Sequence, residues 1–360
     1  MIVDVNLGSR SYRVVVAAGE LQSVGQRLRD LRLGARAALV SDAAVMRLYG
    51  KTVVASLETS GFSVTTIDVP EGEAAKTLAV AQRCWDRLLT AGLDRTSTVL
   101  ALGGGAVGDV AGFAAATYMR GINFVQLPTT VLAQVDASIG GKTAIDHPLG
   151  KNMIGAFHQP RLVVVDPAVA RTLPEREYRS GLAEIVKHGI VLDAGYFDEL
   201  ERDLTPLAAR DLPVLERIIG GSCRLKASVI ERDEREAELR HVLNYGHTIG
   251  HAIEASTGYA QYTHGEAVSL GIVAEARLAG RLGIANEETT ARQQRMLETL
   301  GLPVRAPAID VESVVTAMSR DKKGKDGRIP FVLAPRIGEF RIVYDVPQAD
   351  IRATITSLAS

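Results

Sequence analysis

The sequence has few cysteines and no long apolar run. Its two cysteines, Cys84 and Cys223, lie far apart and within helical patterns, which argues against a disulfide framework or a cysteine-based metal site. No apolar run reaches the length of a membrane span. The first residues alternate like a strand and lack the layout of a signal peptide. These absences predict a cytoplasmic protein with no membrane partner.

The sequence also lacks an excess of charge of either sign. It has 41 basic and 42 acidic side chains, which leaves a formal net charge of −1. This balance argues against a general nucleic-acid-binding surface, although local basic pockets can still exist. At 360 residues the chain is long enough for two domains.

The first half of the chain alternates short apolar strands with helical patterns. Strands are expected at Val3–Leu7, Tyr12–Val16, Ala35–Val40, Ser63–Val69, Thr98–Leu102, Asn123–Leu127 and Leu162–Val165. Helices are expected at Leu21–Leu31, Val45–Thr59, Thr77–Leu89 and Val131–Ser138. This alternation predicts a Rossmann-like α/β domain with a mostly parallel sheet, whose ligands bind at the carboxyl ends of the strands.

The second half is mainly helical. Helices are expected at Glu175–Leu192, Leu212–Arg232, Val242–Ser256, Ala267–Leu282, Glu287–Leu300, Val311–Ser319 and Gln348–Leu358. Two strands, Ile329–Ala334 and Glu339–Tyr344, are expected to pair near the end. The predicted domains are residues 1–170, which would bind a nucleotide, and residues 171–360, which would be mainly helical and bind metal and substrate.

Glycine-rich segments follow several of the predicted strands. Residues 103–109 read GGGAVGD and lie between a strand and a helix, where backbone N–H groups can approach a diphosphate. A tight turn without a ligand remains the alternative. A second segment, residues 140–160, is interpreted as an ordered loop whose Lys142 and Lys151 suit phosphate or carboxylate groups. Glu73 and Lys76 open a helix after another strand.

Histidines gather in one short region. Four of the seven lie between residues 241 and 264, and His247 and His251 are spaced to share one face of a helix. Such a pair often binds a metal, although a histidine-rich exposed helix is an equal alternative at this point. Upstream, Glu184 lies in an apolar helical segment with Lys187 and His188. A buried carboxylate needs a partner, and Glu184 with His247 and His264 would leave an open position for catalysis on a bound metal.

Taken together, these segments resemble the 3-dehydroquinate synthase family from about Glu71 to Leu333. The resemblance is carried by PEGEAAKT, ALGGGAVGDVAGFAAATYMRG, QLPTTVLAQVDASIGGKTAID, GKNMIGAFHQP, SGLAEIVKHG, DEREAELRHVLNYGHTIGHA, HGEAVSLG and RDKK. It implies zinc (or cobalt) held by Glu184, His247 and His264. It assigns His251 to the substrate, so the alternative of His247 and His251 as the ligand pair is set aside.

The resemblance also implies the other site residues. The NAD-binding set would be Asp42, Glu71, Gly72, Glu73, Ala74, Ala75, Lys76, Gly105, Ala106, Val107, Gly108, Asp109, Thr129, Thr130, Asp136, Lys142, Lys151, Val169, Ala170, Arg171 and Thr172. The catalytic set would be Lys142, Lys187, Arg240, Asn244 and His251. The remaining substrate-binding set would be Arg120, Asn152, Lys226, and Lys322 or Lys323.

The implied substrate is 3-deoxy-D-arabino-heptulosonate 7-phosphate, an anionic sugar-acid phosphate. Its conversion to 3-dehydroquinate and phosphate combines transient oxidation by NAD, β-elimination, reduction, ring opening and aldol closure. The family resemblance also implies a homodimer. Three alternatives stay open: a sugar 7-phosphate cyclase that makes a cyclitol, a metal-dependent polyol dehydrogenase, and a nucleotide-binding module without catalysis.

Overall fold

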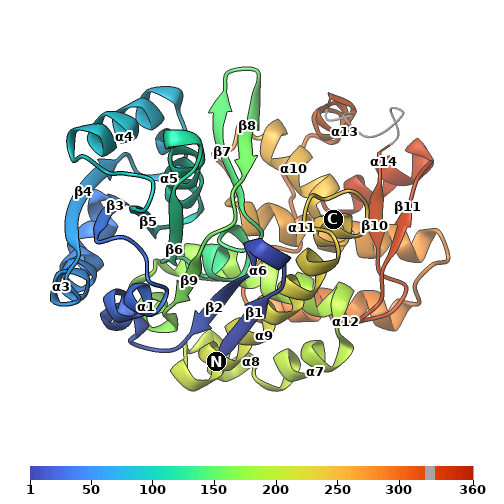
Figure 1. The fold of residues 1–360 in the computed structure, drawn as a ribbon. Helices are drawn as coiled ribbons and strands as arrows, with labels where there is room; N and C mark the ends of the chain where they lie inside the picture. The colour runs from blue at the N-terminus through green and yellow to red at the C-terminus, as the bar shows by residue number, and fades with distance from the viewer. Residues whose placement is uncertain (321–328, 360) are drawn as a thin grey trace. The chain divides into compact units, whose positions relative to one another are not determined.

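The computed structural model describes residues 1–320 and 329–359 (Figure 1). The chain divides into two compact units, Met1–Leu173 with Leu215–Glu234, and Pro174–Val214 with Arg235–Ser360. The predicted domains, residues 1–170 and 171–360, remain predictions, because each was also predicted to bind a particular ligand. Two predicted substrate residues, Lys322 and Lys323, lie outside the described residues.

The first unit is built on a seven-stranded sheet with the strand order β1-β2-β9-β6-β5-β3-β4. The first two strands pair antiparallel, and the other neighbours pair parallel. The strands are β1 Ile2–Val5, β2 Tyr12–Val16, β3 Arg36–Asp42, β4 Ser63–Val69, β5 Thr98–Gly103, β6 Asn123–Pro128 and β9 Leu162–Val165. The predicted mostly parallel sheet is therefore confirmed.

Helices cover both faces of this sheet (Figure 1). They include α1 Val24–Asp30, α3 Lys51–Thr59, α4 Leu78–Thr90 and α5 Gly105–Thr117. The unit also contains α2 Ala43–Val45 and, from later in the chain, most of α9 Leu212–Arg232. In β3, Ala38 and Val40 join the core under α4 and α5. Their neighbours Ala37 and Leu39 join the core under α1 and α3. This alternation explains why the strand is apolar throughout, since both of its faces are buried.

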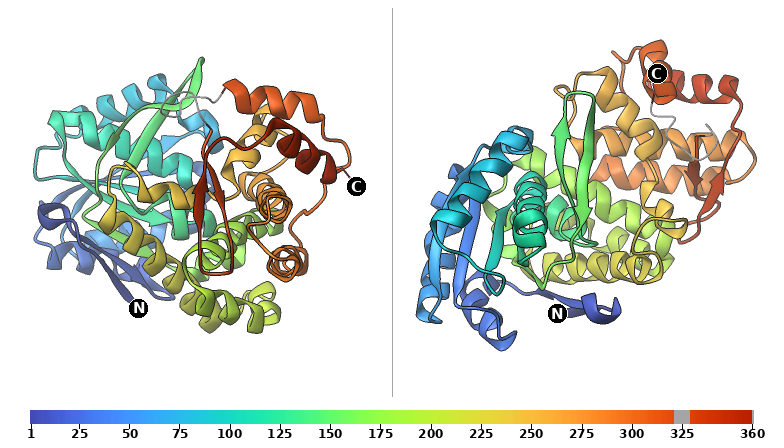
Figure 2. Two further views of the ribbon diagram at one scale, coloured as in Figure 1. Left: turned by 90° about the vertical axis from the view of Figure 1, so that its right-hand side faces the viewer. Right: turned by 45° about the horizontal axis from the view of Figure 1, so that its top comes forward.

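The segment interpreted as a loop is a β-hairpin, so that interpretation was wrong. Strands β7 Lys142–His147 and β8 Gly150–Phe157 pair antiparallel and lie beside α5 (Figure 2). A Cβ added at Gly155 would lie 2.1 Å from the carbonyl oxygen of Thr143, so this glycine permits the close pairing of the strands. In the sequence, the same glycines look like loop residues.

The second unit is mainly helical. Its helices are α6 Glu175–Leu192, α7 Ala194–Arg202, α8 Leu204–Ala208, α10 His247–Ser256, α11 His264–Arg281, α12 Glu287–Thr299, α13 Val311–Arg320 and α14 Gln348–Ser357. Its strands β10 Phe331–Leu333 and β11 Arg341–Val343 pair antiparallel, as expected. Helices α7 and α8 were not predicted from the sequence. Within the described residues, none of the helices is both long and apolar enough to span a bilayer.

Two histidines stand at the first turns of helices. The helix predicted from Val242 begins later, because a 3₁₀ turn at Leu239–Asn244 ends before Gly246, whose φ of 78° is left-handed. Helix α10 therefore starts at His247. Helix α11 starts at His264, where Thr263 and Glu266 form a capping box, a motif that stabilises a helix end by about 1 kcal/mol.

Candidate active site

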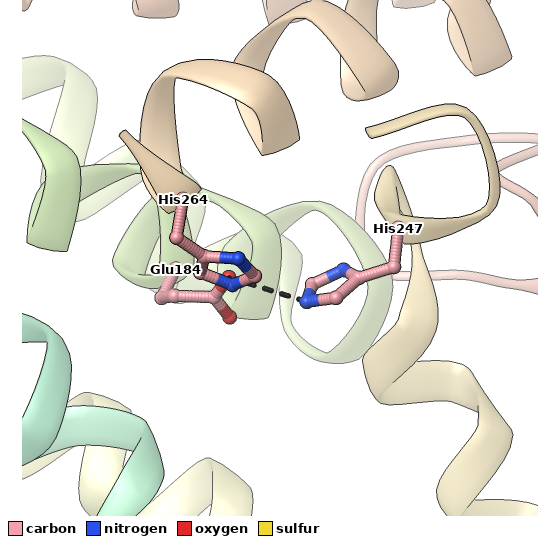
Figure 3. A group of neighbouring side chains, drawn as sticks. All are labelled: Glu184, His247 and His264. Atoms are coloured by element: carbon pink, nitrogen blue, oxygen red, sulfur yellow. Dashed lines mark ion pairs between the residues drawn. The ribbon is translucent and has the colours of Figure 1, made fainter. Parts of the chain in front are cut away.

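Three side chains from three helices converge in the second unit (Figure 3). Glu184 of α6 is fully buried, and its Oε1 lies 3.5 Å from His247 Nε2 and 3.6 Å from His264 Nε2. Two ligands of a tetrahedral zinc, each about 2.1 Å from the ion, lie about 3.4 Å apart. These separations therefore fit a zinc-sized ion bound by one oxygen and two nitrogens.

The second nitrogen of each histidine is also engaged. Nδ1 of His247 lies 3.0 Å from the carbonyl oxygen of Tyr245. Because that oxygen can only accept a hydrogen bond, the proton lies on Nδ1 and Nε2 keeps its lone pair. Nδ1 of His264 lies 3.4 Å from Oε1 of Glu254, a carboxylate–histidine pair of the kind found behind metal ligands. Both rings are thus oriented with Nε2 toward Glu184.

Electrostatics favour an ionised carboxylate at Glu184. Burial alone raises the pKa of Glu184, but the charge of Lys187 and the hydrogen bond from His264 outweigh it and hold that pKa well below its usual range. Lys187, itself 1% exposed, pairs with Glu184 Oε2. Burial lowers the pKa of His247 well below its usual value. The site thus presents an anionic oxygen and a neutral imidazole, which are the forms that bind a metal.

Glycines allow the three helices to approach closely enough to bring the ligands together. A Cβ at Gly265, next to His264, would lie 1.9 Å from the carbonyl oxygen of Ser180 in α6. A Cβ at Gly271 of α11 would lie 1.8 Å from the carbonyl oxygen of Gly246, the residue before His247. Any larger residue at either glycine would push a ligand-bearing helix away.

His251 lies beside this trio. Its ring centroid is 5.0 Å from that of His247 and 5.9 Å from that of His264. With Glu254 and His264 it forms a second group whose ligand atoms lie within 4.8 Å of one another. His251 is exposed, whereas Glu184 is fully buried and the side chain of His247 is 12% exposed, so the more enclosed set is the one containing Glu184.

In the first unit, the predicted nucleotide-binding residues gather where parallel strands end. Asp42 ends β3 and accepts from Val45 N at 2.9 Å as the cap of α2. The other members of the set that follow strands directly are Glu71–Lys76 after β4, Gly105–Asp109 after β5, Thr129 and Thr130 after β6, and Val169–Thr172 after β9. Because parallel strands end at one edge of a sheet, these segments share that edge. The N-terminus of α5 follows the glycines there, an arrangement that suits a phosphate.

A buried lysine organises part of this edge. Lys76 is 3% exposed, lies 2.9 Å from Asp109 Oδ2, and donates to Asn152 Oδ1. Burial raises the pKa of Asp109 to about 6, although Lys76 opposes the shift. Asp146, which the sequence analysis did not single out, accepts from Asn152 N at 2.9 Å and so helps to hold Asn152, whose φ is 58°.

The other predicted residues are divided between the two units. In the first unit, Lys226 of α9 lies 2.6 Å from Asp136 Oδ1, and Lys142 and Lys151 lie on the hairpin. Arg120 also belongs to this unit. Lys187, Arg240, Asn244 and His251 belong to the second unit.

Two acidic residues of the second unit are missing from the predicted set. Glu254, behind His264, lies seven residues after His247 on α10, so helical periodicity could have placed both on one face. Glu236 accepts from Asn244 Nδ2 at 3.5 Å. No local pattern in the sequence points to Glu236, because its φ of 58° puts it in an irregular turn.

Comparison with known proteins gives consistent matches. The family model for the N-terminal part of 3-dehydroquinate synthase matches residues 66–180, and the model for its C-terminal part matches residues 181–324. A curated 3-dehydroquinate synthase of Geobacter metallireducens is 52% identical over 341 residues, which cover 95% of each chain.

Solved structures match over nearly the whole chain. A 2-epi-5-epi-valiolone synthase of Streptomyces hygroscopicus with NAD⁺ and Zn²⁺ bound is 31% identical, with a TM-score of 0.90 over 98% of each chain. A 2-deoxy-scyllo-inosose synthase complexed with carbaglucose-6-phosphate, NAD⁺ and Co²⁺ is 27% identical, with a TM-score of 0.90 over 99% of this chain and 100% of that chain. Since both halves match the family models and a curated relative shares half of its residues, this chain belongs to the 3-dehydroquinate synthase family.

Proposed function

We propose that this chain converts 3-deoxy-D-arabino-heptulosonate 7-phosphate to 3-dehydroquinate and phosphate, with NAD and a divalent metal, zinc or cobalt. The observation that carries the proposal is the trio of fully buried Glu184 and the partly buried His247 and His264, whose separations fit a metal. It occurs in a chain that is 52% identical to a curated enzyme of this activity. When bound, NAD supplies a reversible hydride acceptor and the metal a Lewis acid for a substrate oxygen.

The protein residues supply binding, orientation and charge. Glu184, His247 and His264 hold the metal, and Lys187 and Glu254 fix the carboxylate and one imidazole. The segments at the carboxyl ends of the strands hold NAD, with the N-terminus of α5 directed at its phosphates.

The substrate carries a phosphate and a carboxylate, so it needs several cations. We assign this role to Arg120, Lys142, Lys187, Lys226, Arg240 and one of Lys322 and Lys323. Asn152, Asn244 and His251 supply hydrogen bonds. Bidentate arginines and point-charge lysines are the usual partners of such anions. The enzyme acts as a cytoplasmic homodimer in this proposal.

A cyclitol-forming activity is the second candidate, because two cyclases of that kind share the fold at a TM-score of 0.90. The two candidates differ in whether the substrate carries a carboxylate. The curated relative with 52% identity supports the carboxylate-bearing substrate. Paired assays with the heptulosonate phosphate and with a sugar 7-phosphate lacking the carboxylate separate them.

The deciding experiment measures phosphate release from the heptulosonate phosphate at NAD concentrations far below that of the substrate. The proposal predicts many phosphates per NAD and no accumulation of NADH absorbance, because the hydride returns within each turnover. Stoichiometric NADH without phosphate would replace the proposal with a polyol dehydrogenase. Turnover of the carboxylate-free sugar phosphate alone would favour the cyclitol synthase.

A further inference from the structure

Helix α10, which begins with His247, lacks a cap of its own. The residue at its N-cap, Gly246, has no side chain that could accept from the first N–H groups of the helix. Four N–H groups at a helix start need acceptors from elsewhere when they are buried. The residues of the first turn must therefore find an acceptor on another element.

Glu275 of α11 provides an acceptor at this helix start. Its Oε2 accepts from Gly246 N at 2.7 Å. Burial raises the pKa of Glu275 to about 8, and the backbone N–H groups of Gly246, Ile249 and Thr248 act against this shift. The carboxyl group of Glu275 therefore lies at the N-terminus of α10, hydrogen-bonded to the residue that precedes His247.

Glu275 is an unusual residue for its position. It is 0% exposed, and its neighbours Ala274, Ala276 and Leu278 belong to the buried core. Among the described residues, no donor makes a hydrogen bond to its Oε1. A buried carboxyl with only part of its hydrogen bonds satisfied costs free energy. General packing does not account for it, since an apolar residue would fill an apolar helix face at lower cost.

The first turn of α10 is held from a second direction as well. The Tyr245 carbonyl lies 3.0 Å from Nδ1 of His247, and the Tyr245 hydroxyl lies 2.5 Å from Gln293 Oε1 of α12. Helix α11 thus holds the backbone just before His247 through Glu275, while α12 holds Tyr245, the residue that orients the His247 ring. Because metal–ligand distances are tolerated to within about 0.2 Å, a small shift of this turn would take Nε2 out of reach.

We propose that Glu275 is a positioning residue for the metal: its carboxyl group caps α10 and thereby fixes His247 as a ligand. The role rests on the proposed function, because it presupposes that His247 binds the metal. Since α11 also begins with His264, one helix then sets the positions of both imidazoles, one directly and one through Glu275.

The test measures the Kd for zinc by competition with a chromophoric chelator, on the full chain and without substrate. Glu275→Ala should weaken zinc binding by about 10–100-fold, the range seen when a group behind a metal ligand is removed. Glu275→Gln keeps an acceptor of the same reach and should restore binding to near the wild-type value. The matched control is Ser269→Ala, which removes a buried hydrogen bond of 2.8 Å from the same helix to Pro303 and should leave the Kd unchanged.

Equal Kd values for Glu275→Ala and Ser269→Ala would overturn the positioning role, as would a Glu275→Gln variant as weak as Glu275→Ala. If Glu275→Ala does not fold, Glu275→Asp tests the same point, because it is shorter by one methylene and should weaken zinc while the far-UV circular dichroism stays native. A folded Glu275→Asp variant with the wild-type Kd would then overturn it. His247→Ala separates this failure from failure of the proposed function: if it binds zinc as the wild type does, the metal site itself is wrong.

Discussion

The two candidate sites differ in what holds their residues. In the first unit, the nucleotide-binding set follows the ends of parallel strands, and its geometry depends mostly on backbone turns, glycines and one buried lysine, Lys76. In the second unit, the metal set consists of one fully buried carboxylate and two partly buried imidazoles on three helices, with both nitrogens of His247 and His264 engaged. The metal set can be checked atom by atom against the distances that a metal requires. The nucleotide-binding set is defined only by where the strands end.

This difference leads us to expect large, metal-specific effects in the second unit and smaller effects on nucleotide affinity in the first.

Removing the charge of Glu184 should have the largest effect. Glu184→Gln keeps the volume but supplies a neutral oxygen, and it leaves Lys187 without its buried partner. Zinc affinity should fall by more than about 100-fold, which is more than the loss seen when a group that supports a metal ligand is removed, and activity should vanish. Chelator competition measures the first effect and phosphate release the second.

The control for this variant is Glu177→Gln, an exposed position on the same helix, which should change neither quantity. Wild-type zinc affinity in Glu184→Gln would contradict the assignment of Glu184 as a metal ligand, because the buried carboxylate would then have only a structural role.

Removing the carboxylate of Glu254, which lies beside Nδ1 of His264, should have a smaller effect on zinc affinity. Glu254→Gln leaves the three ligands in place but weakens the hold on Nδ1 of His264. We expect zinc affinity to fall by about 10–100-fold, with activity recovered at saturating zinc. An affinity equal to that of the wild type would mean that Glu254 does not orient the ring.

Zinc affinity should rise with pH. In the metal-free site, burial lowers the pKa of His264, but hydrogen bonds to Glu184 and Glu254 raise it to about 10. The protonated ring therefore stabilises the metal-free form at neutral pH, and this stabilisation is lost as the pH rises through about 10. Zinc must displace that proton, so the apparent affinity should increase about tenfold per pH unit between about pH 6.5 and 8.5. A flat profile in chelator competition would show that the ring is already neutral.

The smallest predicted effect concerns the nucleotide set. A side chain at Gly105 would stand where a diphosphate approaches the backbone, and a Cβ there already lies 3.3 Å from Ala137 Cβ. Gly105→Val and Lys151→Ala should each weaken NAD binding by about tenfold, or about 1.4 kcal/mol, while zinc content stays near one per chain. The NAD affinity is measured by titrating the protein with NAD and following its fluorescence. Unchanged NAD affinity in both variants would contradict the assignment of these segments to NAD binding.

The sheet and its strand ends were predictable because their signals are local. Leu162–Val165 is a continuous apolar run and Ser63–Val69 is rich in β-branched residues, and the observed bounds of both strands match the predicted ones. The β7–β8 hairpin was not predictable in this way. The glycines that let its strands pair closely, such as Gly155, are the residues that otherwise mark loops.

The candidate metal set was only partly predictable from residue types, and its supporting residues were not predictable at all. Glu184 stands out as a carboxylate in an apolar helical segment and the histidines stand out by their clustering, but the family resemblance was needed to choose His264 over His251. The start of α10 at His247 depends on the left-handed Gly246, which lies inside the helix predicted from Val242. Glu275 lies 28 positions after His247, so its role as a cap arises only when α11 packs against α10.

The most direct test compares the two histidines that share one helical face, because the account makes one a ligand and the other not. His247→Ala and His251→Ala are dialysed against excess zinc and desalted, and metal content is read by atomic absorption. The account predicts that His247→Ala loses its zinc and that His251→Ala keeps about one per chain. If His251→Ala loses the metal and His247→Ala retains it, the ligand assignment is contradicted.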